Sequence, residues 1–299
     1  MSKRITHVGF ADESHWNTGR FRALALISTQ AHFVDSLTDQ LLCLLRNEGM
    51  HEFKWINLAG AKERAVAETF CELVVDWAIR RQLRVDVLIW DINDSRHSIR
   101  GRDDVANLQR MYYHLFRNVL RARWPSDAHW ALHPDEHTAM DWETARDCLI
   151  ASSLRLDREP TLYSYDKFRV RLRSEFGIAL IEPLSSEHHP ALQLADLFAG
   201  MAVFSRANFE EYRGWLPAAV GQMPLLEPCD ARPKPSRTSR ERLGLLKRFD
   251  QLCRERKLGV SLCSSRGLRT RDPARPINFW LYEPQHPGDK APQRTKRSP

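Results

Sequence analysis

The sequence has no long apolar run: no window approaches eighteen consecutive apolar residues, which excludes a membrane-spanning helix. Its 13 glycines are scattered, so the glycine-rich phosphate loop of an ATPase is missing, and no G-x-S-x-G segment indicates a serine hydrolase. Six cysteines are spread over 299 residues and none forms a C-x-x-C pair. We therefore expect neither a zinc knuckle nor a disulfide scaffold, but reduced thiols in a cytoplasmic protein.

Charge is distributed unevenly along the chain. Residues 229–299 contain 18 Lys or Arg and seven Asp or Glu, whereas the first 228 residues contain 27 and 31. The net charge of +7 therefore originates in the C-terminal third. This asymmetry favours nucleic acid as a partner over a membrane surface, because the arginines follow no evident amphipathic helix. It does not distinguish DNA from RNA, and a solvated basic tail is the alternative.

The hydrophobic periodicity predicts an α/β fold. Two short strands, 5–10 and 21–28, are separated by a turn, and long helices then alternate with further strands. The expected helices cover residues 32–46, 61–82, 103–123, 140–151 and 190–205, and the further strands 52–58, 84–90, 129–132 and 177–181. The first two strands would pair antiparallel and the later ones, after helical crossovers, would lie parallel. This pattern indicates a three-layer domain with a mixed central sheet flanked by helices.

The composition changes near residue 217. We expect one α/β domain over residues 1–217 and a basic extension, rich in Pro and Arg, over residues 218–299. Within the extension, residues 240–257 have the pattern of a helix and residues 284–299 that of a disordered tail. The extension is expected to contribute affinity for nucleic acid and no chemistry.

Acidic residues recur where strands are expected to end. Asp12, Asp91 and Asp135 follow three of these strands, and open α/β sheets bind ligands at the carboxyl ends of their strands. Asp91 directly follows RVDVLIW, the most apolar strand. We therefore expect Asp91 beside the first strand at the sheet centre, and held more firmly than Asp135, which follows a shorter strand and a proline.

Asp196 is a single carboxylate in the apolar helical segment LQLADLFAG. A buried carboxylate needs a cation, hydrogen-bond donors or water around it, because its burial alone is unfavourable. A solvent-facing position on an amphipathic helix is the alternative. The residues one turn away from Asp196 are small or weakly polar, however, which permits the close approach of another backbone or of a metal ion.

Four segments in this order resemble motifs of the domain-of-unknown-function family 3800. They are ADES at 11–14, EFK at 52–54, PLSS at 183–186 and LQLADLFAG at 192–200. The resemblance spans about residues 5–206 and implies a ribonuclease-H-like fold. The family commonly has Gly after its Asp-Glu-Ser, whereas this sequence has His15.

The resemblance implies acidic ligands at Asp91 and Asp135, and families of this kind resemble components of mobile-element or phage-defence loci. Carboxylates with no Cys and no obligatory His suit Mg²⁺ or Mn²⁺, and two such ions promote the displacement at a phosphodiester. We therefore expect a metal-dependent nuclease with Asp12, Asp91, Asp135 and Asp196 as catalytic carboxylates, and with Glu13 as a further metal ligand. The alternative is a catalytically silent module, on the same fold, that binds nucleic acid or forms a complex.

Overall fold

The computed structural model describes residues 4–94, 104–136, 176–219 and 235–283. Its helices are α1 (Val34–Asn47), α2 (Ala61–Ile79), α3 (Asp104–Val119), α6 (Pro190–Ala207), α7 (Phe209–Ala219) and α8 (Arg237–Glu255), with short 3₁₀ turns η1 (Ala31–Phe33) and η2 (Trp55–Asn57). Its strands are β1 (His7–Ser14), β2 (Phe21–Gln30), β3 (Leu83–Asp91), β4 (Trp130–Pro134), β5 (Ile178–Ile181), β6 (Val260–Ser261), β7 (Arg269–Thr270) and β8 (Ile277–Leu281).

Six strands form the central sheet, in the order β5-β4-β1-β2-β3-β8. β2 pairs antiparallel with both β1 and β3. The other three pairs are parallel: β4 with β1, β5 with β4, and β8 with β3. The predicted α/β fold with a mixed sheet is therefore confirmed. The strand that follows the helix predicted at 61–82 was expected to lie parallel to the earlier strands. This strand is β3, and it pairs antiparallel with β2. The strand on the other side of β1 is β4.

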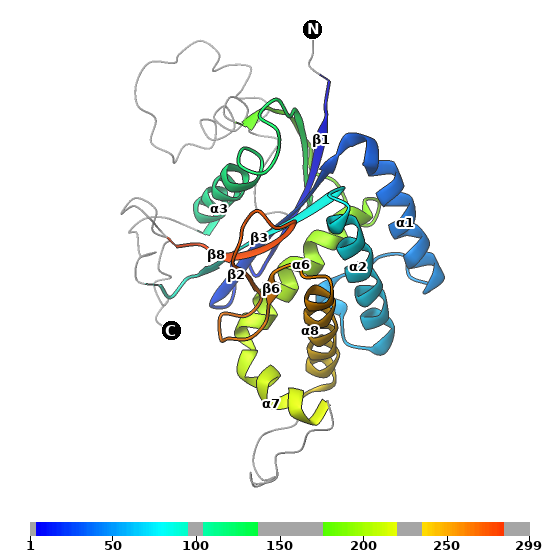
Figure 1. Ribbon diagram of the computed structural model, residues 1–299, viewed down its shortest axis with the longest axis vertical. Coiled ribbons are helices and arrows are strands. Elements are labelled where there is room, and N and C mark those ends of the chain that lie inside the picture. Colours follow the sequence, from blue (N-terminus) through cyan, green and yellow to red (C-terminus); the bar gives the residue numbers. More distant parts are fainter. Residues whose placement is uncertain (1–3, 95–103, 137–175, 220–234, 284–299) are drawn as a thin grey trace, which may run out of the picture.

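Helices cover both faces of the sheet. Figure 1 shows α3 on one side and α1, α2, α6 and α8 on the other. Alternate residues of β2 explain this arrangement: Ala23, Ala25 and Ile27 belong to the core shared with α6, whereas Leu24 and Leu26 belong to the core shared with α3. Every one of these five side chains is inaccessible to solvent, because a strand buried on both faces is apolar throughout.

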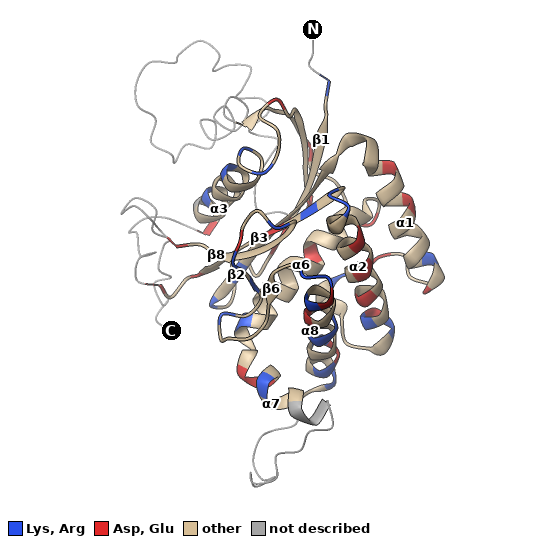
Figure 2. Cartoon of the chain, viewed as in Figure 1, with Lys and Arg blue, Asp and Glu red and all other residues tan. Residues whose placement is uncertain are grey.

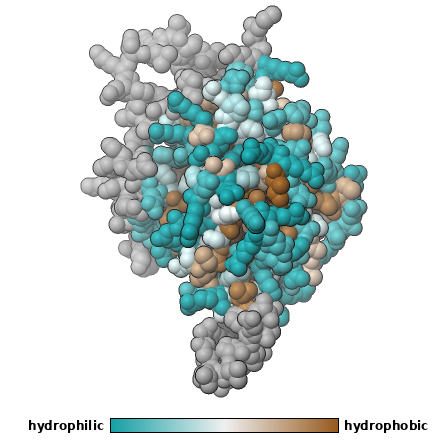
Figure 3. Space-filling view, viewed as in Figure 1, coloured by the Kyte–Doolittle hydropathy of each residue, from teal (hydrophilic) through white to brown (hydrophobic). Residues whose placement is uncertain are grey.

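The surface is polar. Basic residues gather along α8 in Figure 2, and the face drawn in Figure 3 is mostly hydrophilic with small hydrophobic patches. In the part of the chain that the structure describes, no helix is long and apolar enough to cross a membrane.

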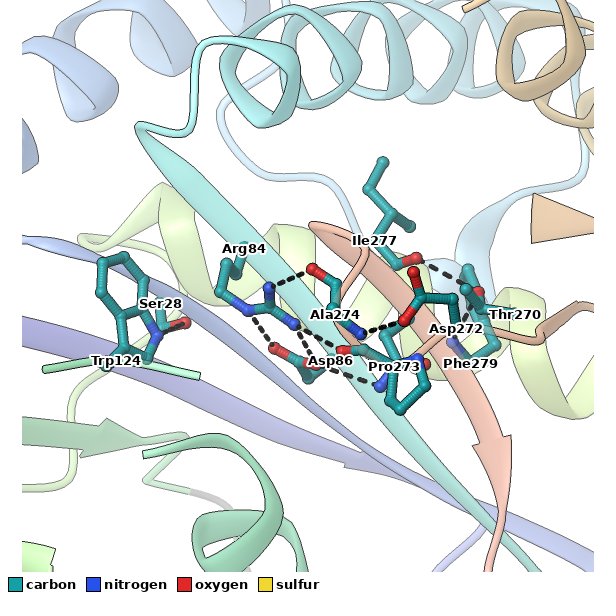
Figure 4. Close-up of polar contacts among 11 residues, drawn as sticks. Ser28, Arg84, Asp86, Trp124, Thr270, Asp272, Pro273, Ala274, Ile277 and Phe279 are labelled. Atoms are coloured by element: carbon teal, nitrogen blue, oxygen red, sulfur yellow. Dashed lines mark hydrogen bonds and ion pairs between the residues drawn. The ribbon is translucent and has the colours of Figure 1, made fainter. Parts of the chain in front are cut away.

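The described residues 235–283 pack against elements that precede residue 217. The predicted helix at 240–257 is α8, which packs on α2, and β8 is the sixth strand of the sheet. Its attachment includes a buried polar network in Figure 4, where Arg84 of β3 bonds Asp86 at 3.0 Å and the carbonyl oxygens of Pro273 and Ala274 at 3.3 Å. The described part of the expected extension therefore packs on the expected α/β domain, because α8 carries a buried apolar face beside its basic residues.

Two further expectations differ from the structure or lie outside it. The expected strand at 52–58 is wrong: this segment contains the turn η2 and pairs with no strand in the described part of the chain. Amide groups of this segment bond instead to side chains of α6. The expected helix at 140–151 and the tail at 284–299 lie outside the described residues.

Candidate functional site

Asp12 and Asp135 lie side by side at the carboxyl ends of two neighbouring parallel strands. Ala11 of β1 pairs with Pro134 of β4, and the Asp135 amide donates to the Ala11 carbonyl at 3.0 Å. Asp12 shares its face of the sheet with Phe10, which packs in the α6 core, because side chains alternate along a strand. The two carboxylates thus come together at the edge of the sheet where ligands were expected.

Asp196 reaches this edge from α6, which crosses β1 and β2. Its Oδ2 accepts a hydrogen bond of 2.6 Å from the Trp55 amide. One turn earlier on the same helix face, Gln193 Oε1 accepts from the Phe53 amide at 2.9 Å, and Gln193 Nε2 donates to the Ser186 carbonyl at 2.8 Å. The extended segment 53–55 therefore lies along α6. Its amides donate to side chains of α6, whereas the amides of a strand would donate to the carbonyl groups of a neighbouring strand.

Gly200 continues the helix face of Gln193 and Asp196, because it is seven residues beyond Gln193. A Cβ atom at Gly200 would overlap the ring of Trp55. The motif LQLADLFAG therefore has a structural explanation: two polar side chains bond alternate amides, and a glycine admits the indole ring. Gln193 was not predicted from the sequence, although a second polar residue at helical spacing from Asp196 was the available signal.

Burial and neighbouring carboxylates raise the pKa of two aspartates at this edge, Asp12 and Asp196. Burial raises the pKa of Asp12 well above its ordinary value, and the charges of Asp196, Glu13 and Asp135 raise it further. Burial also raises the pKa of Asp196 to about 6, with Asp135 and Glu52 adding to the effect, while the Trp55 amide and Lys54 oppose it. Asp12, Asp135 and Asp196 are thus within electrostatic reach of one another, and we call them the acidic cluster.

Glu13 lies next to the acidic cluster, but its side chain turns to the opposite face of the sheet. The Glu13 amide donates to Asp12 Oδ1 at 2.7 Å, and the hydroxyl of Tyr112 on α3 donates to Glu13 Oε2 at 3.0 Å. The backbone of Glu13 therefore positions Asp12, while its carboxylate is held toward α3.

Asp91 is not brought together with the other three aspartates. Its carboxylate bonds Arg20 through Nε at 3.0 Å and through Nη2 at 2.8 Å, and it raises the pKa of Arg206 against the lowering effect of burial. Arg206 is ten residues beyond Asp196 on α6, roughly 15 Å along the helix axis. The expectation that Asp91 lies beside the first strand is wrong, because β2 separates β3 from β1.

Two cations border the acidic cluster. The Lys54 ammonium lies 3.3 Å from Glu52, and although burial lowers its pKa, the charges of Glu52, Asp135 and Asp196 raise it more. Arg242 of α8 donates from Nη2 to the Trp55 carbonyl at 3.0 Å and lies 4.8 Å from the centre of the Trp55 ring. Arg242 was not predicted from the sequence, because this residue lies beyond the expected domain boundary.

The donor set fits a hard divalent cation in its chemistry. Within the described ranges, no three His, Cys, Asp or Glu side chains converge closely enough to form a complete metal site. The acidic cluster nevertheless presents carboxylate oxygens from three separate elements, and their mutual repulsion is the condition that a bound cation relieves. Mg²⁺ and Mn²⁺ prefer such oxygen ligands.

Two proteins of Methanothermobacter thermautotrophicus are similar to the chain over nearly its whole length. The uncharacterized protein ORF2′ is 39% identical over 306 residues, which cover 98% of this chain and 100% of that protein. The uncharacterized protein ORF2 is 39% identical over 300 residues, which cover 96% of this chain and 97% of that protein. No protein-family model matches the chain. Since neither name states an activity, the function must be argued from the site.

Proposed function

We propose that this chain, which belongs to the same family as the uncharacterized proteins ORF2 and ORF2′ of Methanothermobacter thermautotrophicus, is a metal-dependent nuclease that hydrolyses phosphodiester bonds of nucleic acid. The observation that carries the proposal is the acidic cluster: Asp12, Asp135 and Asp196 approach one another from the ends of two strands and from a helix, and the neighbouring carboxylates help to raise the pKa of Asp12 and Asp196. Carboxylates held at such unfavourable proximity are typical of a functional site.

A ribonuclease-H-like fold is part of the same proposal. The motifs ADES at 11–14 and LQLADLFAG at 192–200 resemble the domain-of-unknown-function family 3800, and this resemblance implies a ribonuclease-H-like fold. Two features support it: the first strand lies inside a mixed sheet, and this strand carries an acidic residue at its carboxyl end.

Each residue near the acidic cluster has a role in this proposal. Asp12, Asp135 and Asp196 would hold Mg²⁺ or Mn²⁺, whereas the expected ligand Glu13 is left out because its carboxylate is held toward α3 on the opposite face of the sheet. When bound, such ions lower the pKa of a coordinated water and neutralise charge on the phosphate. Lys54 supplies a positive charge for a substrate phosphate. Asp91 is assigned to its ion pair with Arg20 and is left out of the metal site.

The alternative is a catalytically silent module that binds nucleic acid. The acidic cluster argues against it, because carboxylates repel the phosphates that such a module binds, and a binding function alone gives them no use. The two functions are separated by a cleavage assay and a metal-binding assay on the same variants.

The experiment compares four Asp→Asn variants on labelled DNA, RNA and hybrid substrates with Mg²⁺ or Mn²⁺. We expect Asp12→Asn, Asp135→Asn and Asp196→Asn to lose roughly 100-fold or more in cleavage rate, since changes around a metal site alone cost 10–100-fold. Asp91→Asn is the matched control and should cleave at close to the wild-type rate, because its partner Arg20 is largely exposed.

Thermal unfolding gives a second readout that does not depend on turnover. Mn²⁺ should raise the unfolding temperature of the wild type and of Asp91→Asn, and leave that of Asp12→Asn unchanged. Wild-type cleavage by any variant of the acidic cluster would disprove the metal-site assignment. A protein that binds nucleic acid but cleaves no substrate with either ion would establish the silent module.

A further inference from the structure

A cavity of about 540 Å³ lies along β8, between that strand, α3 and the loops on either side of β7. Its lining is dominated by one residue type. Six arginines line it: Arg117, Arg123, Arg206, Arg266, Arg269 and Arg271. We call this cavity the arginine pocket. Among the lining residues that the structure describes, Glu283 is the single acidic one. The pocket is therefore strongly positive.

Protein carboxylates compensate the charges of these six arginines only in part: Asp91 acts on Arg206 at longer range, and Asp86 interacts with Arg123 in the same way. In the described part of the chain, none of the six forms an ion pair with an Asp or Glu side chain. Arg123 and Arg206 are partly buried, and the Nε atom of each lacks a hydrogen-bond partner. Guanidinium groups gathered in this way fit phosphate, which accepts their paired donors.

The other walls of the arginine pocket suit a nucleobase. Trp280 of β8 is half-buried and contributes an aromatic surface. Asn278, 4% exposed, donates from Nδ2 to Asp86 at 3.3 Å, and its buried Oδ1 has no hydrogen-bond partner. His114 adds no positive charge at neutral pH, because burial and neighbouring arginines lower its pKa to about 3. Its Nε2 lies 2.9 Å from the hydroxyl of Tyr282.

The arginine pocket and the acidic cluster share one edge of the sheet. Ile89 and Leu281, at the carboxyl ends of β3 and β8, line the pocket, and the acidic cluster lies at the carboxyl ends of β1 and β4. Three strand spacings separate β1 from β8, roughly 14 Å at about 4.8 Å per strand. The acidic cluster lies on the α6 face, whereas α3 forms one wall of the pocket, so a nucleic acid strand of a few nucleotides would pass over this edge of the sheet to reach both.

We propose that the arginine pocket binds single-stranded nucleic acid, with its arginines on the phosphates and Trp280 stacked on a base. A single strand is favoured over a duplex because its bases are free to stack on an aromatic side chain. The inference rests on the proposed function, since it supplies the path by which a substrate strand reaches the acidic cluster.

The test measures binding without cleavage, by fluorescence anisotropy of labelled 20-nucleotide oligo(dT) and oligo(rU) in EDTA. The double variant Arg269→Glu/Arg271→Glu removes two arginines whose side chains are exposed. Arg80→Glu/Arg240→Glu makes the same change of charge at exposed positions outside the pocket. We expect the pocket variant to lose at least roughly tenfold in affinity. The slope of log K against log salt concentration should become shallower by about 0.7 for each phosphate that the variant no longer neutralises. The control should stay within about threefold of wild type by the same electrostatic argument.

Substitutions of Trp280 test the stacking on a base. Trp280→Leu should weaken oligonucleotide binding about fivefold and leave the binding of inorganic polyphosphate unchanged, whereas Trp280→Phe should retain oligonucleotide affinity because it retains an aromatic ring. Circular dichroism of each variant establishes that the fold is intact.

Three outcomes would overturn the inference. Equal affinities of the pocket variant and its control would remove the pocket from the binding site. Equal weakening of oligonucleotide and polyphosphate binding by Trp280→Leu would leave an anion site that stacks no base. Tighter binding of a 20-base-pair duplex than of either single strand would refute the preference for a single strand. Because EDTA prevents metal-dependent cleavage, a failure of the proposed nuclease function leaves all three measurements intact.

Discussion

At the scale of single residues, His15 stands directly after ADES, at the position where the motif that this sequence resembles commonly has glycine. It follows β1 directly and has a backbone φ of 58°, in the left-handed region that glycine adopts without steric cost. Its Nδ1 lies 3.3 Å from Thr18 Oγ1 across the same turn. The turn requires this conformation, and the histidine adopts it with strain.

Substitutions at His15 separate the strain from the hydrogen bond with Thr18. We expect the His15→Gly variant to be more stable than His15→Ala by about 1 kcal/mol in free energy of unfolding. The positive φ is unfavourable for alanine and carries no steric cost for glycine. Neither variant has an imidazole to bond Thr18, so the comparison isolates the backbone. Urea unfolding of the two proteins is the measurement, and a more stable His15→Ala would contradict the assignment of strain.

The pKa of Asp196 makes stability depend on pH. It is about 6 in the folded protein, against about 3.9 in an unfolded chain, so the folded state binds more protons between these values. The free energy of unfolding in EDTA should therefore carry a contribution that falls as pH rises from about 4 to about 6, and is constant above.

Asp196→Asn removes this contribution. Relative to wild type, the variant should gain stability between pH 4.5 and pH 7, by roughly 1–3 kcal/mol at 1.4 kcal/mol per pKa unit. The difference between the two urea-unfolding curves at each pH isolates Asp196 from other titrating groups. A difference that is the same at both pH values would show that Asp196 titrates normally.

At the scale of elements, the packing of α6 against the segment 53–55 holds the acidic cluster in place. Gly200→Ala should lower the free energy of unfolding by about 1–3 kcal/mol, because the added Cβ displaces the Trp55 ring. It should also slow metal-dependent cleavage, since the Trp55 amide bonds Asp196.

Gly244 in α8 is the matched control for Gly200. A Cβ there meets only the flexible end of Arg64, at 3.1 Å from Nη1. Gly244→Ala should therefore stabilise the protein by about 0.5–1 kcal/mol, because alanine favours a helix. Destabilisation by both substitutions to the same extent would mean that the packing of Trp55 on Gly200 has no special role.

Local patterns in the sequence predicted the long elements well. The helices α1, α2, α3 and α6 follow apolar residues at helical spacing. Asp12 was proposed because it follows an apolar strand, and Asp196 because it interrupts an apolar helix. The segment 52–58 was misassigned because an extended backbone resembles a strand in sequence, whether its amides bond another strand or the side chains of Gln193 and Asp196. Asp91 was misplaced because strand order depends on contacts between distant residues, and no local pattern records them.

At the scale of the whole molecule, the C-terminal part completes the body. We expect a chain that ends at Glu255 to lose cooperative unfolding, because it lacks β8 and exposes the edge of β3 and the apolar residues beneath Phe279. A chain that ends at Glu283 retains every described strand and helix and should match the full-length protein. Urea unfolding followed by circular dichroism distinguishes them, and equal midpoints for the two chains would contradict this role of β8.

The contacts of α8 and β8 with the rest of the sheet and its helices were not predicted from the sequence. Residues 218–299 were assigned to an extension on charge and on their content of Pro and Arg, and neither property shows which apolar residues are buried. The buried face of α8, with Leu243, Leu246 and Phe249, is diluted by the arginines between these residues. Only the pairing of β8 with β3 reveals that the sheet needs the last part of the chain.

The position of β8 also determines when the molecule can finish folding during translation. Asn278 and its partner Asp86 are 192 residues apart, an interval that a ribosome takes roughly 10–40 s to synthesise at 5–20 residues per second. Throughout that time β3 is complete and its outer edge has no strand of its own chain to pair with. Neighbouring nascent chains on one messenger present the same open edge, so slow synthesis or closely spaced ribosomes would favour pairing between the edges of different chains.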